Sequence, residues 1–372
     1  MQIILTFCIK SIKFYAERWG YALHRFDYSF LESGMLPAGL FNLASDIYSI
    51  RAANQSRRGN YEEIFTELAA IAKVQSVKSS NAIEGIVTTD RRIDEIVNGN
   101  SAPLNHSEQE IAGYRDALAL VHSQYGQMDF CQRDILRLHR VMLDVAGYDH
   151  AGRYKDVDND IIEEDRQGRR RVRFHPTSAA DTPEEMEQLV LAYQEARDNL
   201  RVNQLLLIPC VILDFLCIHP FRDGNGRMSR LLSLLLLYRN GFEAGKYISF
   251  EEQINHRKGN YYEALRKSST GWHENGNEYF PFIIEFITTL YMCYKELDKR
   301  FALVGSRKVT KQARVEATIL NSLTPISKAE IGRILPDVSA TTIEAVLGRM
   351  VKNGTIRKIG SGRGTRYIPC QN

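Results

Sequence analysis

Two strongly apolar segments separated by a short polar loop constrain this chain more than any other feature. The first segment reads LLLIPCVILDFLCI, and from Pro209, which suits the first turn of a helix, its residues are apolar on nearly every side. The second reads RMSRLLSLLLLYRNG and ends at Gly241. A short connection makes two such helices antiparallel neighbours. The sequence therefore predicts a buried helical hairpin whose polar loop lies at the surface end of the core.

Composition narrows the class of protein. The 372 residues are 44% apolar and 25% charged, which is typical of a soluble globular chain with two or three domains. No apolar run reaches the roughly 18 residues that a membrane span needs. The N-terminus lacks both the basic segment and the cleavage site of a signal peptide. The six cysteines form no Cys-x-x-Cys pair, so we expect reduced thiols in a cytoplasmic protein.

Helical periodicity dominates the chain before residue 307. Apolar residues recur at helical spacing in segments at 61–85, 107–126, 129–147 and 181–199. Gly85 ends the first segment, and Ser107 is the expected N-cap of the second, with Gln109 or Glu110 near the third helical position. Residues 155–174 instead alternate weakly around a Gln167-Gly168 turn, which predicts a β-hairpin or an extended flap. We therefore expect a mainly α fold with one hairpin in this part of the chain.

The C-terminal residues 307–372 differ in charge from the rest. They contain twelve Lys or Arg against four acids, a net charge of +8, so the remaining residues carry −5. Their pattern predicts three short helices, with Ser327 and Ser339 as caps, and two strands around a glycine-rich turn. This order is similar to a winged helix-turn-helix, with a recognition helix at about 340–353 and a wing at about 360–365. Docking to a protein, or dimerisation, is the alternative role for such a module. The candidate DNA contacts, mainly to phosphates, are Thr341, Thr342, Arg349, Lys352, Arg363 and Arg366.

The polar loop reads HPFRDGNGRMSR at 219–230 and concentrates groups that bind phosphate. Gly224, Asn225 and Gly226 precede a helix start, where closely approaching backbone N–H groups and the helix dipole favour an anion. Arg227 can pair with two phosphate oxygens, and Arg230 falls on the same face of the new helix. The loop therefore predicts a phosphate site.

Two further loop residues suit catalysis. Asp223 is a natural ligand for Mg²⁺, which binds through one or two carboxylates plus substrate phosphates. His219 exchanges a proton near neutral pH and can act as a general base. Taken singly, a capping histidine, a Gly-Asn-Gly turn and an Asx-turn are simpler interpretations, but together they leave the charges unexplained. The combination predicts transfer of a phosphoryl-type group to a hydroxyl, without the G-x-x-x-x-G-K-(S/T) motif of a P-loop.

These twelve residues resemble the signature of Fic domains, H-x-F-x-(D/E)-G-N-G-R-x-x-R, at every fixed position. The resemblance covers roughly residues 64–296 and implies a helical domain with a β-hairpin flap over the active site. Most Fic proteins are adenylyltransferases, which move AMP from ATP to a Ser, Thr or Tyr hydroxyl of a target protein and release pyrophosphate. The resemblance implies this reaction here, on a target and on the chain itself, with ATP as substrate and Mg²⁺ (or Mn²⁺) as the metal.

The signature assigns roles residue by residue. It implies that His219 is the general base and that Asp223 holds the metal between the α- and β-phosphates. Relatives that phosphorylate tend to carry a lysine at the position of Gly226, so the glycine favours AMP transfer. The implied anion hole and phosphate-binding arginine are Gly224, Asn225, Gly226 and Arg227.

The segment NYYEAL resembles the part of the family that lies beside adenine. This resemblance implies that Tyr261 and Tyr262 lie near the base. A nucleotide-contacting Asn often follows about seven residues later, where this chain has Ser269, so the base contacts depart from the pattern.

A second motif reads SSNAIEG and contains Ser80-x-x-x-Glu84-Gly85. It resembles the inhibitory pattern of the family, (S/T)-x-x-x-E-(G/N), in which the glutamate pairs with the last signature arginine, here Arg230. A carboxylate on that arginine opposes productive ATP binding by its charge and by occupying the donor. An ordinary surface glutamate near a helix end is the alternative interpretation.

We expect three domains and several partners. The domains are an N-terminal helical region at 1–105 with the inhibitory helix at about 64–85, a Fic core at 106–300 and a winged-helix domain at 307–372. The expected partners are a target protein, DNA through the C-terminal domain and a second copy in a homodimer, with no membrane. One alternative is a DNA-binding regulator whose Fic domain only senses nucleotide, although sensing needs no base such as His219. Another is a site that also removes AMP, with Glu84 aligning a water.

Overall fold

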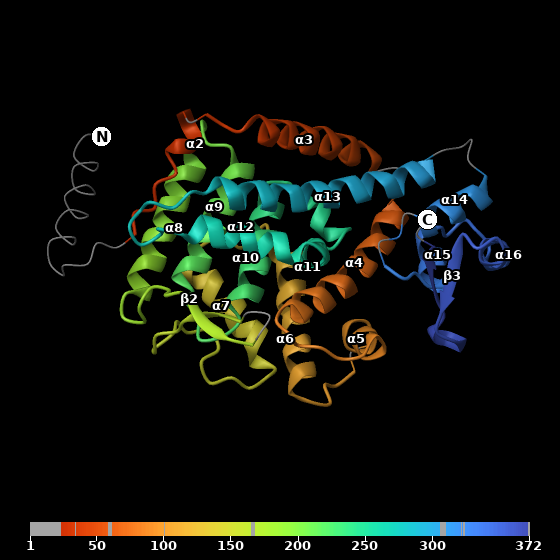
Figure 1. The fold of residues 1–372 in the computed structure, drawn as a ribbon, viewed down its shortest axis with the longest axis horizontal. Coiled ribbons are helices and arrows are strands. Elements are labelled where there is room, and N and C mark those ends of the chain that lie inside the picture. The colour runs from red at the N-terminus through yellow and green to blue at the C-terminus, as the bar shows by residue number, and fades with distance from the viewer. Residues whose placement is uncertain are drawn as a thin grey trace. The chain divides into compact units, whose positions relative to one another are not determined.

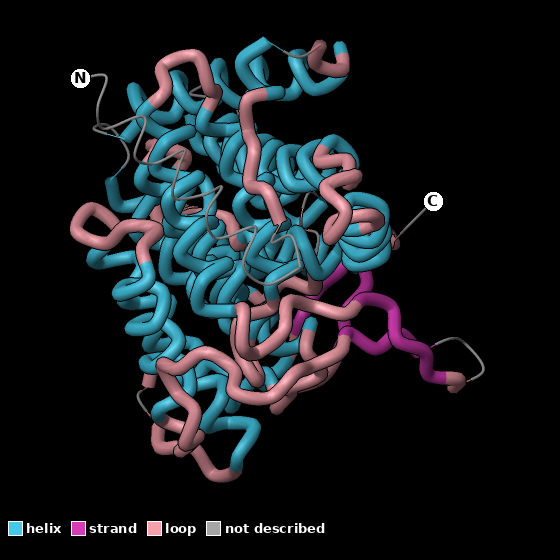
Figure 2. Tube along the Cα trace, turned by 90° about the vertical axis from the view of Figure 1, so that its left-hand side faces the viewer, coloured by secondary structure: helices cyan, strands magenta, loops and turns pink. Residues whose placement is uncertain are grey.

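A computed structural model describes residues 24–33, 35–58, 62–99, 101–164, 168–305, 310–320, 322 and 324–370. The fold is mainly helical, as the sequence predicts, and in these residues strand is confined to two short hairpins (Figure 2). None of the helices described there is long and apolar enough to cross a membrane. The chain divides into two compact units, and each is described by itself. The first unit is Met1–Leu36, Leu104–Asn240 and Arg257–Ile287, and the second is Pro37–Pro103, Gly241–His256 and Thr288–Asn372.

The first unit is a helical bundle with one hairpin (Figure 1). Helices α8, α10 and α12 pack against α9, in which every residue from Leu205 to Ile218 is buried. Buried residues also fill most of α10, so these two helices form the centre of the core. The elements are α2 (Phe30–Ser33), α6 (His106–Gln124), α7 (Gln132–Asp144), β1 (Ile161–Glu164), β2 (Arg170–Phe174), α8 (Thr182–Asp198), α9 (Gln204–Ile218), α10 (Asn225–Arg239) and α12 (Lys258–Ser269).

The predicted hairpin of apolar helices is confirmed, but one boundary is wrong. Helix α9 begins at Gln204, where the side chain of Asn203 accepts the N–H of Leu205, and Pro209 lies inside the helix. A proline there removes one helical hydrogen bond. Burial on all sides of α9 outweighs that loss, because each fully buried Leu or Ile contributes about 1.5–3 kcal/mol.

The predicted cap of α6 is also wrong. Asn105, not Ser107, is the N-cap: its backbone is extended, and its side chain accepts the N–H of Glu108. The Glu108 carboxylate in turn accepts the N–H of Leu104. These two bonds satisfy two backbone N–H groups at the helix start. The second N–H belongs to the residue before the N-cap, so the arrangement differs from a capping box. Ser107 therefore lies inside the first turn.

The expected flap is a β-hairpin. Strands β1 and β2 pair antiparallel with Ile162 opposite Val172, and both side chains are exposed. Arg171 pairs with Glu163 across the hairpin, 2.9 Å apart. Strand β1 begins at Ile161, six residues after the predicted start, and its register shifts between Ile161 and Ile162. Gln167 of the predicted turn lies outside the described residues, as does the N-terminal segment 1–23.

The second unit contains the remaining elements. Its α4 ends at Ile83, and Gly85 then takes a left-handed φ of 80°, which fits the predicted stop. Within the unit, the hydroxyl of Ser76 on α4 donates to the carboxylate of Glu251, 2.7 Å away, and both residues are fully buried. The elements are α3 (Ala38–Arg58), α4 (Glu62–Ile83), α5 (Asp90–Val97), η1 (Glu243–Lys246), α11 (Phe250–His256), the C-terminal part of α13 (Phe280–Gly305), α14 (Lys311–Leu320), α15 (Lys328–Ile334), α16 (Ala340–Lys352), β3 (Ile356–Ile359), η2 (Gly362–Gly364) and β4 (Arg366–Pro369).

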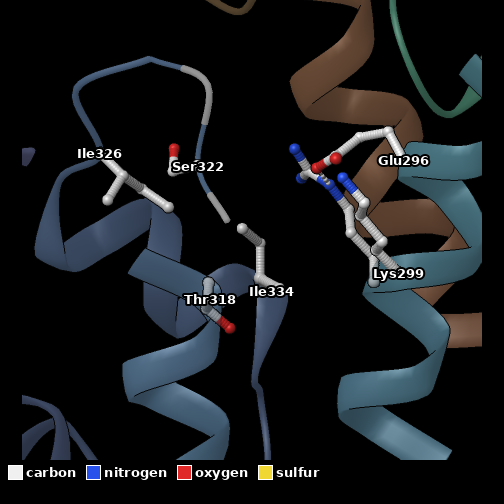
Figure 3. Close-up of a pocket in the computed structure, with 7 residues that line it drawn as sticks. Glu296, Lys299, Thr318, Ser322, Ile326 and Ile334 are labelled. Carbon is white, nitrogen blue, oxygen red and sulfur yellow. Dashed lines mark hydrogen bonds and ion pairs between the residues drawn. The ribbon is translucent and has the colours of Figure 1, made fainter. Parts of the chain in front are cut away.

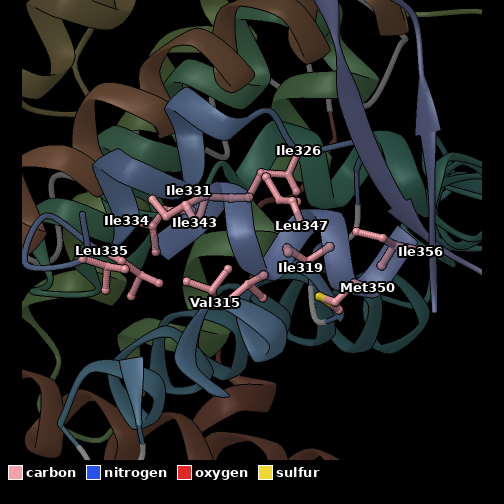
Figure 4. Close-up of a cluster of buried hydrophobic side chains, with 12 residues drawn as sticks. Val315, Ile319, Ile326, Ile331, Ile334, Leu335, Ile343, Leu347, Met350 and Ile356 are labelled. Atoms are coloured by element: carbon pink, nitrogen blue, oxygen red, sulfur yellow. The ribbon is translucent and has the colours of Figure 1, made fainter. Parts of the chain in front are cut away.

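Residues 310–370, here called the C-terminal module, have a hydrophobic core of their own (Figure 4). Three helices and the antiparallel pair β3–β4 supply it, in the order that the sequence predicts. Ser327 and Ser339 are the N-caps of α15 and α16, also as predicted. Ile71 of α4 packs against this core, as does Tyr367. The buried core residues are Val315, Ile319, Ile326, Ile331, Ile334, Leu335, Val338, Ile343, Val346, Leu347, Met350 and Ile356.

Candidate active site

His219 ends α9 in a left-handed conformation, with φ 52° and ψ 58°. Its N–H donates to the carbonyl of Phe215, and its Nδ1 lies 3.3 Å from the carbonyl oxygen of Leu216. A carbonyl oxygen only accepts, so this contact assigns the ring proton to Nδ1. Nε2 then keeps the lone pair that a general base requires.

The loop after His219 is closed by one side chain. Asn225 accepts the N–H of Phe221 at 2.9 Å and donates to the carbonyl of the same residue at 2.7 Å. Phe221 is fully buried and stacks on His139, with ring centroids 3.7 Å apart. The Asn225 side chain therefore holds the loop's own backbone, and its contribution to an anion hole is limited to its backbone N–H.

His139 supports the loop from α7, a role that the sequence did not suggest. Its Nδ1 accepts the N–H of Gly152 at 3.0 Å, so Nε2 carries the proton and donates to the carbonyl of Asp223 at 3.1 Å. Burial lowers the pKa of His139 to about 4, so the ring stays neutral near pH 7. The helical pattern of α7 indicates only that His139 lies on the buried face of the helix. The sequence therefore did not suggest its contact with the loop.

The start of α10 can hold an anion. Gly224 is its N-cap with φ 80°, and Asn225 and Gly226 are its first two residues. The N–H groups of a first helical turn have no partner within the helix, and the helix dipole there favours negative charge. This end of α10 thus suits a phosphate group.

Arg227 is fully buried between two carboxylates. Its guanidinium lies 2.7 Å from Glu110 of α6 and 3.1 Å from Asp223. Glu110 was predicted as a capping partner, whereas in the structure it forms this ion pair. The three residues make a row in which Glu110 fixes Arg227 and Arg227 fixes the carboxylate of Asp223. Arg227 was predicted to bind phosphate directly, and these contacts give it a second role as a support.

A divalent metal fits this site only together with phosphates. Within the described parts of the chain, no group of three His, Cys, Asp or Glu side chains could hold a metal ion. The side chain of Asp223 is 47% exposed, so one carboxylate is accessible. Mg²⁺ typically binds through one or two carboxylates, waters and substrate phosphates rather than in a protein cage. The residues present therefore fit an ion that binds together with a phosphate ligand.

The Fic/DOC family model matches residues 129–237. That range contains α7, the hairpin β1–β2, α8, α9, the whole loop and nearly all of α10. The chain contains a Fic domain. The signature residues and the helices that present them thus belong to one recognised unit of sequence.

Two curated relatives match parts of the chain of different length. A protein adenylyltransferase Fic from Nematostella vectensis is 28% identical over 208 residues, which is 54% of this chain and 44% of that protein. Protein adenylyltransferase fic-1 from Caenorhabditis elegans is 29% identical over 109 residues, 29% of this chain and 19% of that protein. The matches thus span less than half the length of these two curated relatives.

Solved structures of Fic proteins have the same fold. A Fic family protein from Desulfovibrio desulfuricans has a TM-score of 0.57 at 20% identity, covering 91% of this chain and 98% of its own. A Fic domain-containing signaling protein from Bacteroides thetaiotaomicron also has a TM-score of 0.57, at 21% identity, covering 70% of this chain and 97% of its own. At these identities the likeness describes the fold alone.

The remaining nucleotide candidates of the Fic domain lie on α10 and α12. Arg230 is buried. Tyr261 is buried and Tyr262 is exposed, with their rings nearly perpendicular and 6.0 Å apart. Ser269, at the position of the expected Asn, accepts a hydrogen bond from Arg173 of the flap at 2.9 Å. This position therefore ties α12 to the flap.

The candidate inhibitory residues lie at the end of α4, in the second unit. Ser80 is fully buried in the helix, whereas Glu84 and Gly85 follow its last residue and are exposed. The helix therefore ends just before the glutamate, and the backbone at Gly85 turns away through a left-handed conformation.

The candidate DNA contacts of the C-terminal module are largely engaged within it. Arg349 pairs with Glu316 at 2.6 Å, and Arg366 pairs with Glu330 at 3.1 Å. The hydroxyls of Thr341 and Thr342 each lie 2.9 Å from that of Ser339. Lys352 is exposed, and the side chain of Arg363 lies outside the described residues.

A small cleft between α13 and the C-terminal module is separate from the signature (Figure 3). Arg300 donates to Glu296 along α13 at 3.1 Å, so one of the two cations is paired. No signature residue lines this cleft, which therefore does not form part of the candidate active site. Its lining residues are Glu296, Lys299, Arg300, Thr318, Ser322, Ile326 and Ile334.

Proposed function

We propose that this chain is a protein adenylyltransferase, which moves AMP from ATP to a Ser, Thr or Tyr hydroxyl of a target protein and of itself. The observation that carries the proposal is the loop at 219–230. It combines a histidine with its lone pair on Nε2, an accessible carboxylate and a helix N-terminus suited to phosphate. Two relatives are named protein adenylyltransferases, which supports this chemistry at the level of the family.

In the proposed reaction, the target hydroxyl oxygen attacks the α-phosphorus of ATP. Nε2 of His219 takes the hydroxyl proton while the new oxygen–phosphorus bond forms. The bond from the α-phosphorus to the oxygen that bridges to the β-phosphorus breaks, and pyrophosphate leaves. The N–H groups that begin α10 stabilise the charge on the phosphate oxygens.

The row of Glu110, Arg227 and Asp223 prepares the metal ligand. Arg227 holds the Asp223 carboxylate, and Glu110 holds Arg227. Asp223 would hold Mg²⁺ (or Mn²⁺), which would neutralise charge on the phosphates when bound. The protein's own contribution is to keep this carboxylate in place before the nucleotide arrives.

We also propose that Glu84 inhibits the enzyme by pairing with Arg230, as the inhibitory motif implies. A carboxylate on that arginine would compete with the terminal phosphate of ATP for the same donor. The exposure of Glu84 at the end of α4 supports this role, because an exposed carboxylate pays little desolvation when it pairs.

The alternative of a DNA-binding regulator has less support. Two of its candidate arginines, Arg349 and Arg366, are engaged by glutamates of the same module. A nucleotide sensor also has no use for a base in the position of His219. Removal of AMP by the same site stays a second possibility for the enzyme itself.

The test of the proposed function is intact-mass measurement after incubation with Mg²⁺ and ATP. Three full-length proteins are compared: wild type, Glu84→Gly, and Glu84→Gly with His219→Ala. We expect one adenylyl group on Glu84→Gly, little on wild type and none on the double variant. An ATP analogue with a methylene group between the α- and β-phosphorus atoms is the control, because its bridge cannot break. Absence of the adduct from Glu84→Gly would contradict the proposal. Loss of the adduct after ATP is exhausted and wild type, which retains Glu84, is added would reveal AMP removal.

A further inference from the structure

Three hydrogen bonds from one upstream segment hold the backbone around His219. Nζ of Lys155 donates to the carbonyl of Ile218 at 3.2 Å, and the N–H of Lys155 donates to that of Pro220 at 2.9 Å. Asn159 donates from Nδ2 to the carbonyl of Phe221 at 3.0 Å. Lys155 and Asn159 also bond to each other, at 2.8 Å. The carbonyls immediately before and after His219 thus have partners in residues 155–159.

The backbone conformation of His219 requires such support. Among the described residues, only His219 and Asn275 have a positive φ without being glycine. A left-handed conformation costs an L-residue about 1–2 kcal/mol, and it persists where the surroundings fix it. The bond to Ile218 fixes the peptide group that precedes His219, and the bond to Pro220 fixes the peptide group that follows Pro220.

The character of Lys155 matches its position. Its side chain lies at the C-terminal end of α9, where carbonyls lack partners and a cation interacts favourably with the helix dipole. Lys155 is 3% exposed. Burial lowers its pKa to about 8, so it stays protonated and keeps its donors near pH 7.

No ion pair accounts for this buried cation. Among the described residues, no carboxylate lies within ion-pair distance of Nζ, and its partners are a carbonyl and an amide. Burying a charge costs free energy, and a neutral side chain would avoid that cost. The placement therefore points to a role beyond packing.

We infer that Lys155 and Asn159 are positioning residues for His219. They hold the backbone on both sides of the histidine and so direct its imidazole toward the reacting hydroxyl. The inference rests on the proposed function, in which His219 is the base. The same segment leads directly into β1, so the base and the flap share one anchor.

The test measures kcat and KM for ATP in full-length Glu84→Gly, using transfer of AMP to itself. Lys155→Met and Asn159→Ala are introduced separately into this parent. We expect kcat to fall about tenfold or more, because small errors in the position of a catalytic group lower rates strongly. KM for ATP should stay within about twofold, since the phosphate contacts at α10 are unchanged. The temperature is one at which circular dichroism shows each variant folded.

Asn203→Ala is the matched control. It removes a cap at the opposite end of the same helix, which costs about 1 kcal/mol. We expect its kcat to stay within about twofold of the parent. If Lys155→Met and Asn159→Ala lose no more kcat than Asn203→Ala, while the parent transfers AMP, the inference is wrong and the proposed function stands.

A second readout does not depend on activity. Nitrogen NMR of histidine-labelled protein distinguishes the two neutral tautomers of His219. We expect the Nδ1-protonated form in wild type and in Asn203→Ala, and a mixture of tautomers in Lys155→Met. An unchanged tautomer in Lys155→Met would overturn the inference even if the proposed function fails and no AMP is transferred.

Discussion

Gly224 is restricted in two ways at the turn into α10. Its φ of 80° lies in the left-handed region, and a Cβ added there would lie 2.6 Å from Cε of Met142. A side chain at this position therefore strains the backbone and displaces a residue of α7. Both effects act on the part of the loop that begins the phosphate site.

Replacing this glycine should affect both stability and transfer. We expect Gly224→Ala to lower the free energy of unfolding by about 1–3 kcal/mol and to reduce AMP transfer at least about tenfold. Gly126→Ala is the control, because Gly126 has open space around its Cβ position and no positive φ. Urea unfolding and intact-mass measurement report the two effects. Equal free energies of unfolding for the two variants would show that the left-handed backbone and the contact with Met142 accommodate a Cβ at position 224 without loss of stability.

At the scale of residues, the signature could be identified from the sequence, but the residues that contact and hold its loop could not. Spacing within one loop identifies His219 and Asp223, because the loop is contiguous. Glu110, His139 and Lys155 contact the loop from distant parts of the chain, and no local pattern records such pairs. The sequence interpretation of Glu110 as a capping residue was reasonable for a helix start and wrong for the fold.

At the scale of elements, α15 shows how a short helix is fixed at one end. Ser327 accepts the N–H of Glu330, and the Glu330 carboxylate accepts the N–H of Ser327. Glu330 also pairs with Arg366 of β4. The capping box thus secures the helix start and ties it to the hairpin of the C-terminal module.

Removing this cap should weaken the module. We expect Ser327→Ala to lower the free energy of unfolding by about 1 kcal/mol, because an N-cap hydroxyl satisfies an otherwise free N–H. Ser361→Ala is the control, since Ser361 precedes η2 without a side-chain cap bond. Denaturant unfolding compares the two, and a loss in Ser361→Ala as large as that in Ser327→Ala would argue against the capping contribution.

Elements differ in how well their ends could be predicted. The caps Ser327 and Ser339 follow from local chemistry, because a serine before an amphipathic run has few competitors. The starts of α6 and α9 are predicted wrongly. Asn105 competes with Ser107 as the N-cap of α6, and Pro209, expected in the first turn, lies inside the helix that Asn203 caps. In α9, burial keeps the helix intact through Pro209, and helix propensity alone does not contain that information.

At the scale of the whole molecule, a buried carboxylate joins distant parts of the first unit. Asp214 of α9 accepts hydrogen bonds from Tyr28 at 2.8 Å, from Trp272 at 2.8 Å and from Tyr279 at 3.0 Å. Burial raises the pKa of Asp214 to about 7. The segment around Tyr28 and the segment that precedes α13 thus meet at one titratable group.

This group should make stability depend on pH. The pKa of Asp214 is raised on folding, so its contribution is present below the unfolded pKa, about 4, and is lost as pH rises through about 7. His24, 3.8 Å away, acts in the opposite direction, because burial lowers its pKa to about 4. In Asp214→Asn only the first effect is removed.

We therefore expect Asp214→Asn and wild type to differ in how their free energies of unfolding change between about pH 5 and about pH 7. Over this range the variant should gain about 2 kcal/mol relative to wild type, since each proton contributes at most about 1.4 kcal/mol per pH unit. Urea unfolding at the two pH values measures the difference. Parallel pH profiles would mean that Asp214 titrates at its ordinary pKa.

The mainly helical fold class was predictable from the sequence because helical periodicity runs through most of the chain. The division into two units was not, since the chain enters each of them more than once. Patterns of charge and periodicity describe contiguous stretches of sequence. Each unit, in contrast, is formed by segments that are far apart along the chain.

The bonds from residues 155–159 to the backbone around His219 also bear on how active enzymes are identified from gene sequences. A search for the signature reads twelve contiguous letters and would accept a gene copy that had lost Lys155 or Asn159. Such a copy would look like an intact enzyme by its motif while its histidine was no longer held. The protein from a duplicated gene would therefore lose activity through a change at Lys155 or Asn159 while its signature stayed intact. These two positions would distinguish active enzymes from inactive copies better than the signature does.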